Sequence, residues 1–210
     1  MEMYQENWKR NLEDFINEVS SPSYHIESGG FRKNLLSFGI YGRHRRRVYD
    51  EVGKLVIYAD TSASKFCSTM ISEVSEMAKN YDITECDINL FADNDYAEHQ
   101  DLDINDVSSV VSDNESVSST NKVSPNSVYN HIVNNYMDDY ELDDEVSAII
   151  IMTTVDSVEN YEKNSGFEQF DDCRDKMLFL LFNPNNKSEQ ELKELIPKDS
   201  RLLTITPDEI

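Results

Sequence analysis

Residues 54–64 read KLVIYADTSAS, and this stretch predicts a buried strand that ends in oxygen-bearing side chains. The run from Leu55 to Ala59 is apolar and unbroken, which is typical of a strand covered on both faces of a sheet. Asp60, Ser62 and Ser64 follow it directly. Because open α/β sheets bind their ligands at the carboxyl ends of the strands, we select these three residues as the first candidate site.

Further strands alternate with helices along the chain. The patterns predict strands at 83–91, 148–152, 177–182 and 201–205, and helices at about 65–80, from Ser124-Pro125 onward and from Ser188 to about 196. Serine followed by proline is a favoured helix start, and Ser188 with Glu191 forms a capping box. Strands separated by helices of this length predict an α/β fold with a Rossmann-like, doubly wound and mainly parallel sheet.

The first 50 residues predict a helix and a basic arm that pack on the main domain. Five apolar residues at helical spacing indicate an amphipathic helix, namely Trp8, Leu12, Phe15, Ile16 and Val19. The densest basic cluster of the chain follows, at Arg43, Arg45, Arg46 and Arg47. We expect residues 51–210 to form the main domain, with a solvated, acidic and serine-rich insertion at about 96–122.

The composition disfavours several classes of function. The formal net charge of the 210 residues is −22, so most of the surface would repel the phosphate backbone of a nucleic acid. Three widely spaced cysteines without a CxxC motif are typical of reduced thiols in a cytosolic protein. No apolar run approaches the roughly 18 residues of a membrane span, and the first residues lack the apolar core of a signal peptide. We therefore expect a cytoplasmic protein that binds neither membranes nor nucleic acids.

The Asp-x-Ser-x-Ser order after a buried strand resembles the first metal-binding segment of von Willebrand factor A (VWA) domains. Other features extend the resemblance over nearly the whole chain: Asn7-Trp-Lys-Arg-Asn-Leu12 on the opening helix, the arginine run before the first strand, the strand DINLFAD, and the apolar strand before Asp156. In this order they resemble most closely the carboxyl-terminal VWA-like domain of predicted bacterial metallopeptidase-like proteins encoded beside MoxR-type AAA+ ATPases. The resemblance implies a Rossmann-like domain that binds partners and is not itself a catalyst.

The same resemblance implies a metal-ion-dependent adhesion site, in which Mg²⁺ or Mn²⁺ binds a carboxylate of the partner. Its ligands would be Asp60, Ser62 and Ser64, with Ser124 and Asp156 from two later segments. Hydroxyls and carboxylates are the hard oxygen ligands that suit Mg²⁺. The first segment matches the family well, although Ala63 replaces a customary glycine. The later segments match loosely, because Ser124, or alternatively Thr120, stands for the threonine of a Gly-Gly-Thr turn, and Val155-Asp156-Ser157 stands for Thr-Asp-Gly.

The implied partner is a protein, either a MoxR-type AAA+ ATPase or a component of an assembly. The cluster of Arg43, Arg45, Arg46 and Arg47 is expected to pair with acidic groups of that partner or with carboxylates of this chain.

Two alternative functions remain open at this point. The chain could be a structural or assembly protein with a metal-free VWA fold, and a composition rich in Asn, Asp, Ser, Ile and Tyr is compatible with a low-GC bacterium or its phage, which would place it in the host cytoplasm. It could instead be a metal-dependent phosphatase-like hydrolase with Asp60 as nucleophile, but Ser62 stands where such enzymes need a second aspartate. Without a metal, Asp60 and the serines would act as caps of the following helix.

Overall fold

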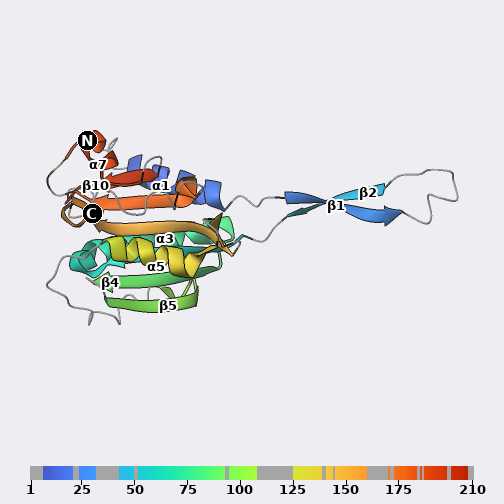
Figure 1. Cartoon of the computed structure of the whole chain (residues 1–210), viewed down its shortest axis with the longest axis horizontal. Coiled ribbons are helices and arrows are strands. Elements are labelled where there is room, and N and C mark those ends of the chain that lie inside the picture. The colour runs from blue at the N-terminus through green and yellow to red at the C-terminus, as the bar shows by residue number, and fades with distance from the viewer. Residues whose placement is uncertain are drawn as a thin grey trace. The chain divides into compact units, whose positions relative to one another are not determined.

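The computed structural model describes residues 7–20, 24–31, 43–49, 52–92, 95–107, 125–138, 141–143, 145–159, 170, 173–183, 185, 187–197 and 200–207. The chain divides into two compact units, which are described separately. The larger unit comprises Met1–Ser20 and Gly53–Ile210, and the smaller one comprises Ser21–Val52. Figure 1 shows both units with their elements labelled.

A six-stranded sheet forms the centre of the larger unit. Its strands are β3 (Lys54–Asp60), β4 (Glu85–Ala92), β5 (Asp95–Asp103), β8 (Val146–Thr154), β9 (Met177–Phe182) and β10 (Arg201–Ile205), in the order β10-β9-β8-β3-β4-β5. All neighbours are parallel except β4 and β5, which are antiparallel. This arrangement confirms the predicted α/β fold with a doubly wound, mainly parallel sheet.

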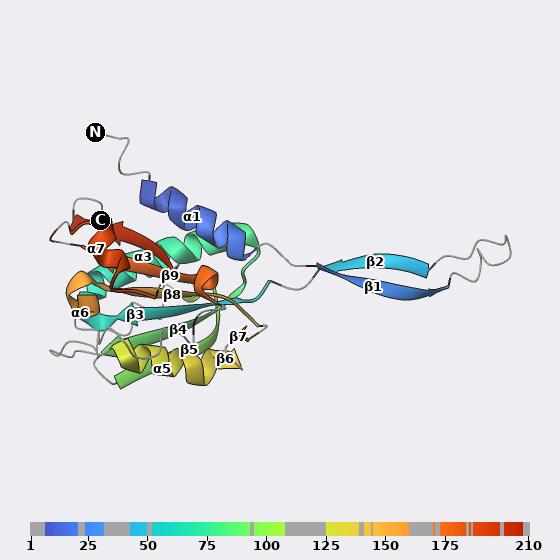
Figure 2. The same ribbon diagram turned by 45° about the horizontal axis from the view of Figure 1, so that its top comes forward.

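Helices cover both faces of this sheet (Figure 2). Helices α1 (Asn7–Val19) and α3 (Ser64–Ala78) lie on one face, and α5 (Pro125–Tyr136) lies on the other. The remaining elements are shorter: α6 (Val155–Glu159), α7 (Glu189–Lys193), the 3-10 turns η1 (Thr61–Ala63), η2 (Lys79–Tyr81) and η4 (Arg174–Lys176), and the paired segments β6 (Met137–Asp138) and β7 (Glu141–Leu142). Ser188 caps α7 in the predicted capping box with Glu191.

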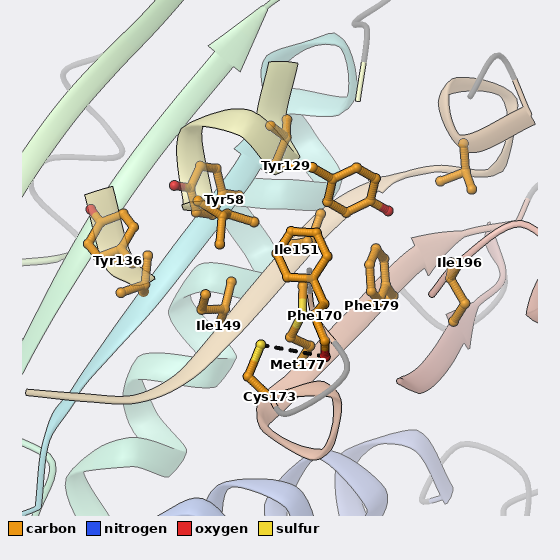
Figure 3. Packing of buried hydrophobic residues seen from close by; sticks show 14 of the residues in the cluster. Tyr58, Tyr129, Tyr136, Ile149, Ile151, Phe170, Cys173, Met177, Phe179 and Ile196 are labelled. Carbon is orange, nitrogen blue, oxygen red and sulfur yellow. Dashed lines mark hydrogen bonds between the residues drawn. The ribbon is translucent and has the colours of Figure 1, made fainter. Parts of the chain in front are cut away.

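A large apolar cluster joins α5 and α7 to the sheet (Figure 3). Ile149 and Ile151 of β8 are buried in it beside Phe179 of β9. The ring of Tyr129 on α5 packs against Phe170, with 5.3 Å between the ring centroids. Central parallel strands are apolar on both faces because both faces are covered, and for this reason the runs in β3, β8 and β9 were recognisable in the sequence.

The prediction of a solvated insertion from residue 96 is wrong over β5. Residues 95–103 form a strand that pairs with β4, and Ile104 and Val107 beyond it are buried. An edge strand exposes much of its surface to water, so its acidic composition resembled that of a loop. The rest of the expected insertion, 108–122, lies outside the described residues.

The smaller unit contains a two-stranded antiparallel hairpin. Strand β1 (Tyr24–Phe31) pairs with β2 (Arg43–Tyr49), and Glu27 lies opposite Arg46 in the register. The arginines of the predicted basic arm therefore belong to a strand.

Gly53 allows the start of β3 to approach the start of β8. The backbone N–H of Lys54 donates to the carbonyl of Glu145 at 2.8 Å, and the Ser147 hydroxyl donates to the carbonyl of Gly53 at 3.1 Å. A Cβ atom at position 53 would lie 2.6 Å from the Glu145 carbonyl oxygen, which is shorter than any normal contact. The absence of a side chain is therefore needed where the two central strands begin.

We predict that Gly53→Ala lowers the free energy of unfolding by about 1–3 kcal/mol, because the added methyl group must displace backbone rather than a flexible side chain. Urea unfolding followed by circular dichroism measures the change. The control is Thr84→Ala, which alters an exposed residue before the neighbouring strand β4 and should change stability by less than about 0.5 kcal/mol. Equal stability of Gly53→Ala and the wild type would contradict the close approach.

Candidate interaction site at the carboxyl end of the sheet

The candidate site lies where the central strands β3 and β8 end side by side. Asp60 is the last residue of β3, and Thr153 and Thr154 are the last residues of β8. The two strands are parallel neighbours, with Ala59 opposite Met152. The chain leaves β3 toward β4 on one side and later returns to β8 on the other side, so this is the topological switch point of the sheet. Ligands of open α/β sheets bind at such a point.

The carboxylate of Asp60 is fully buried and accepts three hydrogen bonds. Its Oδ2 atom accepts from the Thr153 hydroxyl at 2.7 Å and from the Ser157 hydroxyl at 3.0 Å. Its Oδ1 atom accepts from the backbone N–H of Ser62 at 2.8 Å. Burying a carboxylate is costly unless it is hydrogen-bonded, and these donors supply that compensation.

Hydroxyl groups at the end of β8 and on α6 form the other half of the site. Thr154 Oγ1 donates to Ser157 Oγ at 2.9 Å and accepts from the backbone N–H of Ser157 at 3.1 Å. This pairing holds the first turn of α6 and directs the Ser157 hydroxyl toward Asp60. Thr153 and Ser157 are buried, whereas Asp156 between them in sequence order is exposed on α6.

The residues selected from the sequence have different positions. Asp60 is at the centre of the site, and Ser62 contacts it through its backbone while its side chain is exposed. Ser64 is the first residue of α3, but its side chain lies outside the described part of the structure, as do Ser124 and Thr120 entirely. The selection missed Thr153, Thr154 and Ser157. The sequence contained an indication of their role, because these polar residues follow the predicted strand 148–152 in the same way that Ser62 follows β3.

The buried thiol of Cys67 contacts the backbone of Asp60. The Sγ atom of Cys67 on α3 donates to the backbone carbonyl of Asp60 at 3.2 Å. Burial, and after it the nearby charge of Asp60, raise the pKa of the Cys67 thiol well above its usual range. This direction favours the protonated form, in which Cys67 packs as a small buried side chain.

The local charge at the site is low. Among the described side chains, no lysine or arginine forms an ion pair with Asp60, and no group of three or more His, Cys, Asp or Glu residues is arranged to hold a metal ion. A cation at this edge would depend on at most two carboxylates, those of Asp60 and Asp156, together with hydroxyl oxygens.

A second polar network connects α5 to the strand that carries Asp60. The Tyr58 hydroxyl is hydrogen-bonded to Nδ1 of His131 at 2.8 Å, and Nε2 of His131 is hydrogen-bonded to Glu98 on β5 at 2.9 Å. Tyr58 precedes Asp60 by two residues on β3, and α5 begins just after Ser124. This network fixes α5 relative to the strand from which the site extends.

Two of the solved structures that resemble this chain are a mussel byssus protein and a bacterial membrane protein. No protein-family model and no curated protein sequence matches the chain. The first of the two structures is proximal thread matrix protein 1 from the mussel byssus, whose structure is described with a zinc-occupied MIDAS motif. It is 9% identical to this chain, with a TM-score of 0.49. The match covers 73% of this chain and 43% of that chain, so this chain spans less than half of the mussel protein. An aerotolerance-related membrane protein from Bacteroides fragilis is 9% identical with a TM-score of 0.47, covering 75% of this chain and 93% of that chain. Likeness of this degree establishes no shared site or activity.

The length and hydropathy of a helix decide whether it could span a membrane. None of the helices in the described part of the chain has the length and apolar character of a membrane span.

We predict that Thr153→Val lowers the free energy of unfolding by about 1–3 kcal/mol, because the buried carboxylate of Asp60 loses one of its donors while the shape of the side chain is kept. Chemical denaturation at neutral pH measures the effect. The matched control is Thr204→Val on β10, where the side chain is half-buried and away from Asp60. Equal effects of the two substitutions would show that the Thr153 hydrogen bond contributes nothing specific.

Proposed function

We propose that this protein is a non-catalytic protein-interaction module of the VWA-like class, which docks its partner at the carboxyl ends of β3 and β8. The observation that supports this proposal most directly is the position of Asp60 at the switch point, held by the hydroxyls of Thr153 and Ser157. A carboxylate that is buried and bound by three donors is a poor nucleophile, because attack would require it to lose those hydrogen bonds. This favours docking over the phosphatase-like alternative.

The chemistry of the donor set fits a hard divalent cation. Thr153 and Ser157 direct their protons to Asp60, so each oxygen keeps a lone pair for a cation, although Ser157 already accepts one hydrogen bond from Thr154. The exposed hydroxyl of Ser62 is the third oxygen donor, and Ser64, Ser124 and Asp156 are the further proposed ligands. When bound, Mg²⁺ or Mn²⁺ would supply an electrophilic centre for a carboxylate of the partner.

The partner that we propose is a MoxR-type AAA+ ATPase or a component of an assembly, met in the cytoplasm. The support is the resemblance of the sequence, in particular the Asp60-x-Ser62-x-Ser64 order and the arginine cluster Arg43, Arg45, Arg46 and Arg47. An acidic side chain on the partner would suit both the cation and the arginines.

A second candidate is a metal-free interaction fold in a structural or assembly protein. One observation favours it: the hydrogen-bonding needs of the Asp60 carboxylate are met by Ser62, Thr153 and Ser157 within the protein. The partner would then contact the edge of the sheet directly.

We predict that Mg²⁺ raises the melting temperature of the wild type relative to EDTA. With a dissociation constant of about 1 mM, about 10 mM Mg²⁺ adds about 1.4 kcal/mol of stability. For a domain of this size that corresponds to roughly 3–6 °C. Differential scanning calorimetry measures the shift. Ser62→Ala should abolish it without unfolding the protein, because the side chain is exposed.

The matched control is Ser72→Ala, which removes an exposed hydroxyl from α3 that bonds only to the carbonyl of Ser68. It should keep the full Mg²⁺ effect. An unchanged wild type, or an equal shift in Ser62→Ala, would contradict the metal site. Calorimetric titration with a purified MoxR-type ATPase then separates the candidates: binding that survives EDTA selects the metal-free fold, and no binding under either condition rejects that partner.

A further inference from the structure

The charge of this chain is divided between its two units. Residues 21–52 contain six Lys or Arg and three Asp or Glu, which makes a net charge of +3. The rest of the chain contains 13 Lys or Arg and 38 Asp or Glu, a net charge of −25. The basic residues of the smaller unit are concentrated in β2, whose sequence RHRRRVY has four arginines and no acidic residue. A basic strand is therefore attached to a strongly acidic body.

The hairpin of β1 and β2 has backbone groups available for pairing. Within the described residues, β1 and β2 pair only with each other, so each has one open edge. An isolated two-stranded hairpin is only marginally stable in water. The unpaired N–H and C=O groups of an open edge are a template for another strand. Strand β2 thus combines an open edge with a high positive charge.

The six-stranded sheet offers an acidic edge. Its two edge strands are β5 and β10. Strand β5, with the sequence DYAEHQDLD, has four acidic residues and no Lys or Arg, whereas β10, RLLTI, has one arginine and no acidic residue. The side chains of Glu98 and Asp101 on β5 are 42% and 72% exposed. Of the two edges, only β5 matches the charge of β2.

A local irregularity limits the usable part of this edge. Asp101 has a φ of 52°, and the register with β4 shifts between Cys86 and Ile88 at the same point. Such a bulge interrupts regular pairing. The regular edge is the segment Asp95–Gln100, which is close in length to the seven residues of β2.

We infer that β2 of one copy of this protein binds along β5 of a second copy and extends its sheet by one strand. Backbone hydrogen bonds would provide affinity, and the arginines of β2 against the acids of β5 would provide specificity. A nucleic acid would offer negative charge to the arginines but no strand edge to the backbone of β2, whereas β5 offers both. A second copy, by contrast, always carries the complementary strand. This inference does not depend on the metal site.

The proposed contact joins different surfaces of the two copies. The contact gives a closed dimer when β2 of each copy binds β5 of the other copy. When the exchange is not reciprocal, the contact links successive copies into an open-ended assembly. Sedimentation distinguishes these two forms of association, and either one agrees with the inference.

The test is analytical ultracentrifugation of the full chain from about 1 to about 100 μM at about 0.15 M salt, which screens the long-range repulsion between two acidic copies while contacts at short range persist. The wild type should self-associate. Arg45→Glu/Arg47→Glu, which reverses charge on β2, should weaken association at least about tenfold. Asp95→Lys/Gln100→Lys, which adds positive charge to β5 and leaves the contact between Glu98 and His131 in place, should do the same. An equimolar mixture of these two variants should associate again, which also establishes that both are folded.

The control is Arg10→Glu/Lys79→Glu, which changes the net charge as much as the arm variant does, at two exposed positions of α1 and η2. It should change the association constant by less than about threefold. A wild type that stays monomeric at all concentrations would overturn the inference, as would an arm variant that associates no more weakly than this control. Failure of the mixture to associate would also overturn it. So would binding of a DNA duplex by the arginines of β2 in a monomeric wild type.

Discussion

The burial of the Asp60 carboxylate is the constraint on which the candidate site and the centre of the fold both depend. An ionised carboxylate loses its hydration in the interior, and the cost is several kcal/mol unless hydrogen bonds replace the water. The donors come from the turn after β3, from the end of β8 and from α6. These three segments must therefore meet in the correct register before Asp60 can be buried. The need of the buried Asp60 carboxylate for hydrogen-bond donors therefore links the order of the strands to the geometry of the site.

A second set of polar contacts, which includes the start of β3, fixes the part of the sheet that contains β4 and β5. Lys54 on β3 forms ion pairs with Asp87 on β4 and Asp101 on β5. Burial by itself lowers the pKa of Lys54, but hydrogen bonds to Asp87 and Asp101 outweigh it, so the pKa is raised and the amine stays charged. Nearby, Asn89 donates to the hydroxyl of Tyr136, whose pKa burial raises to about 12. We infer that these directional contacts select one position for β5 and α5, which apolar packing alone would specify less uniquely.

The parts of the fold that could be predicted from the sequence are those whose physical cause is local. Apolar runs mark β3, β8 and β9 because a central parallel strand is covered on both faces. The acidic β5 was missed because an edge strand does not need that pattern. Thr153 was missed for another reason: its role depends on a hydrogen bond to Asp60, 93 residues away, which exists only through the register of β3 and β8. The polar residues after the predicted strand 148–152 mark this segment as a candidate, but no local pattern assigns the contact with Asp60 to Thr153.

The low local charge at Asp60 would determine which kind of partner the proposed site accepts. The whole protein has a net charge of −22, so an acidic partner meets repulsion at long range. Without a cation, the edge offers the carboxylates of Asp60 and Asp156 with neutral hydroxyls, and a basic or neutral side chain suits it better than an acidic one. Mg²⁺ bound to the same oxygens would neutralise these carboxylates and would make a partner carboxylate the better ligand. The presence or absence of the cation would therefore reverse the charge preference of the site, while the fold that presents it stays the same.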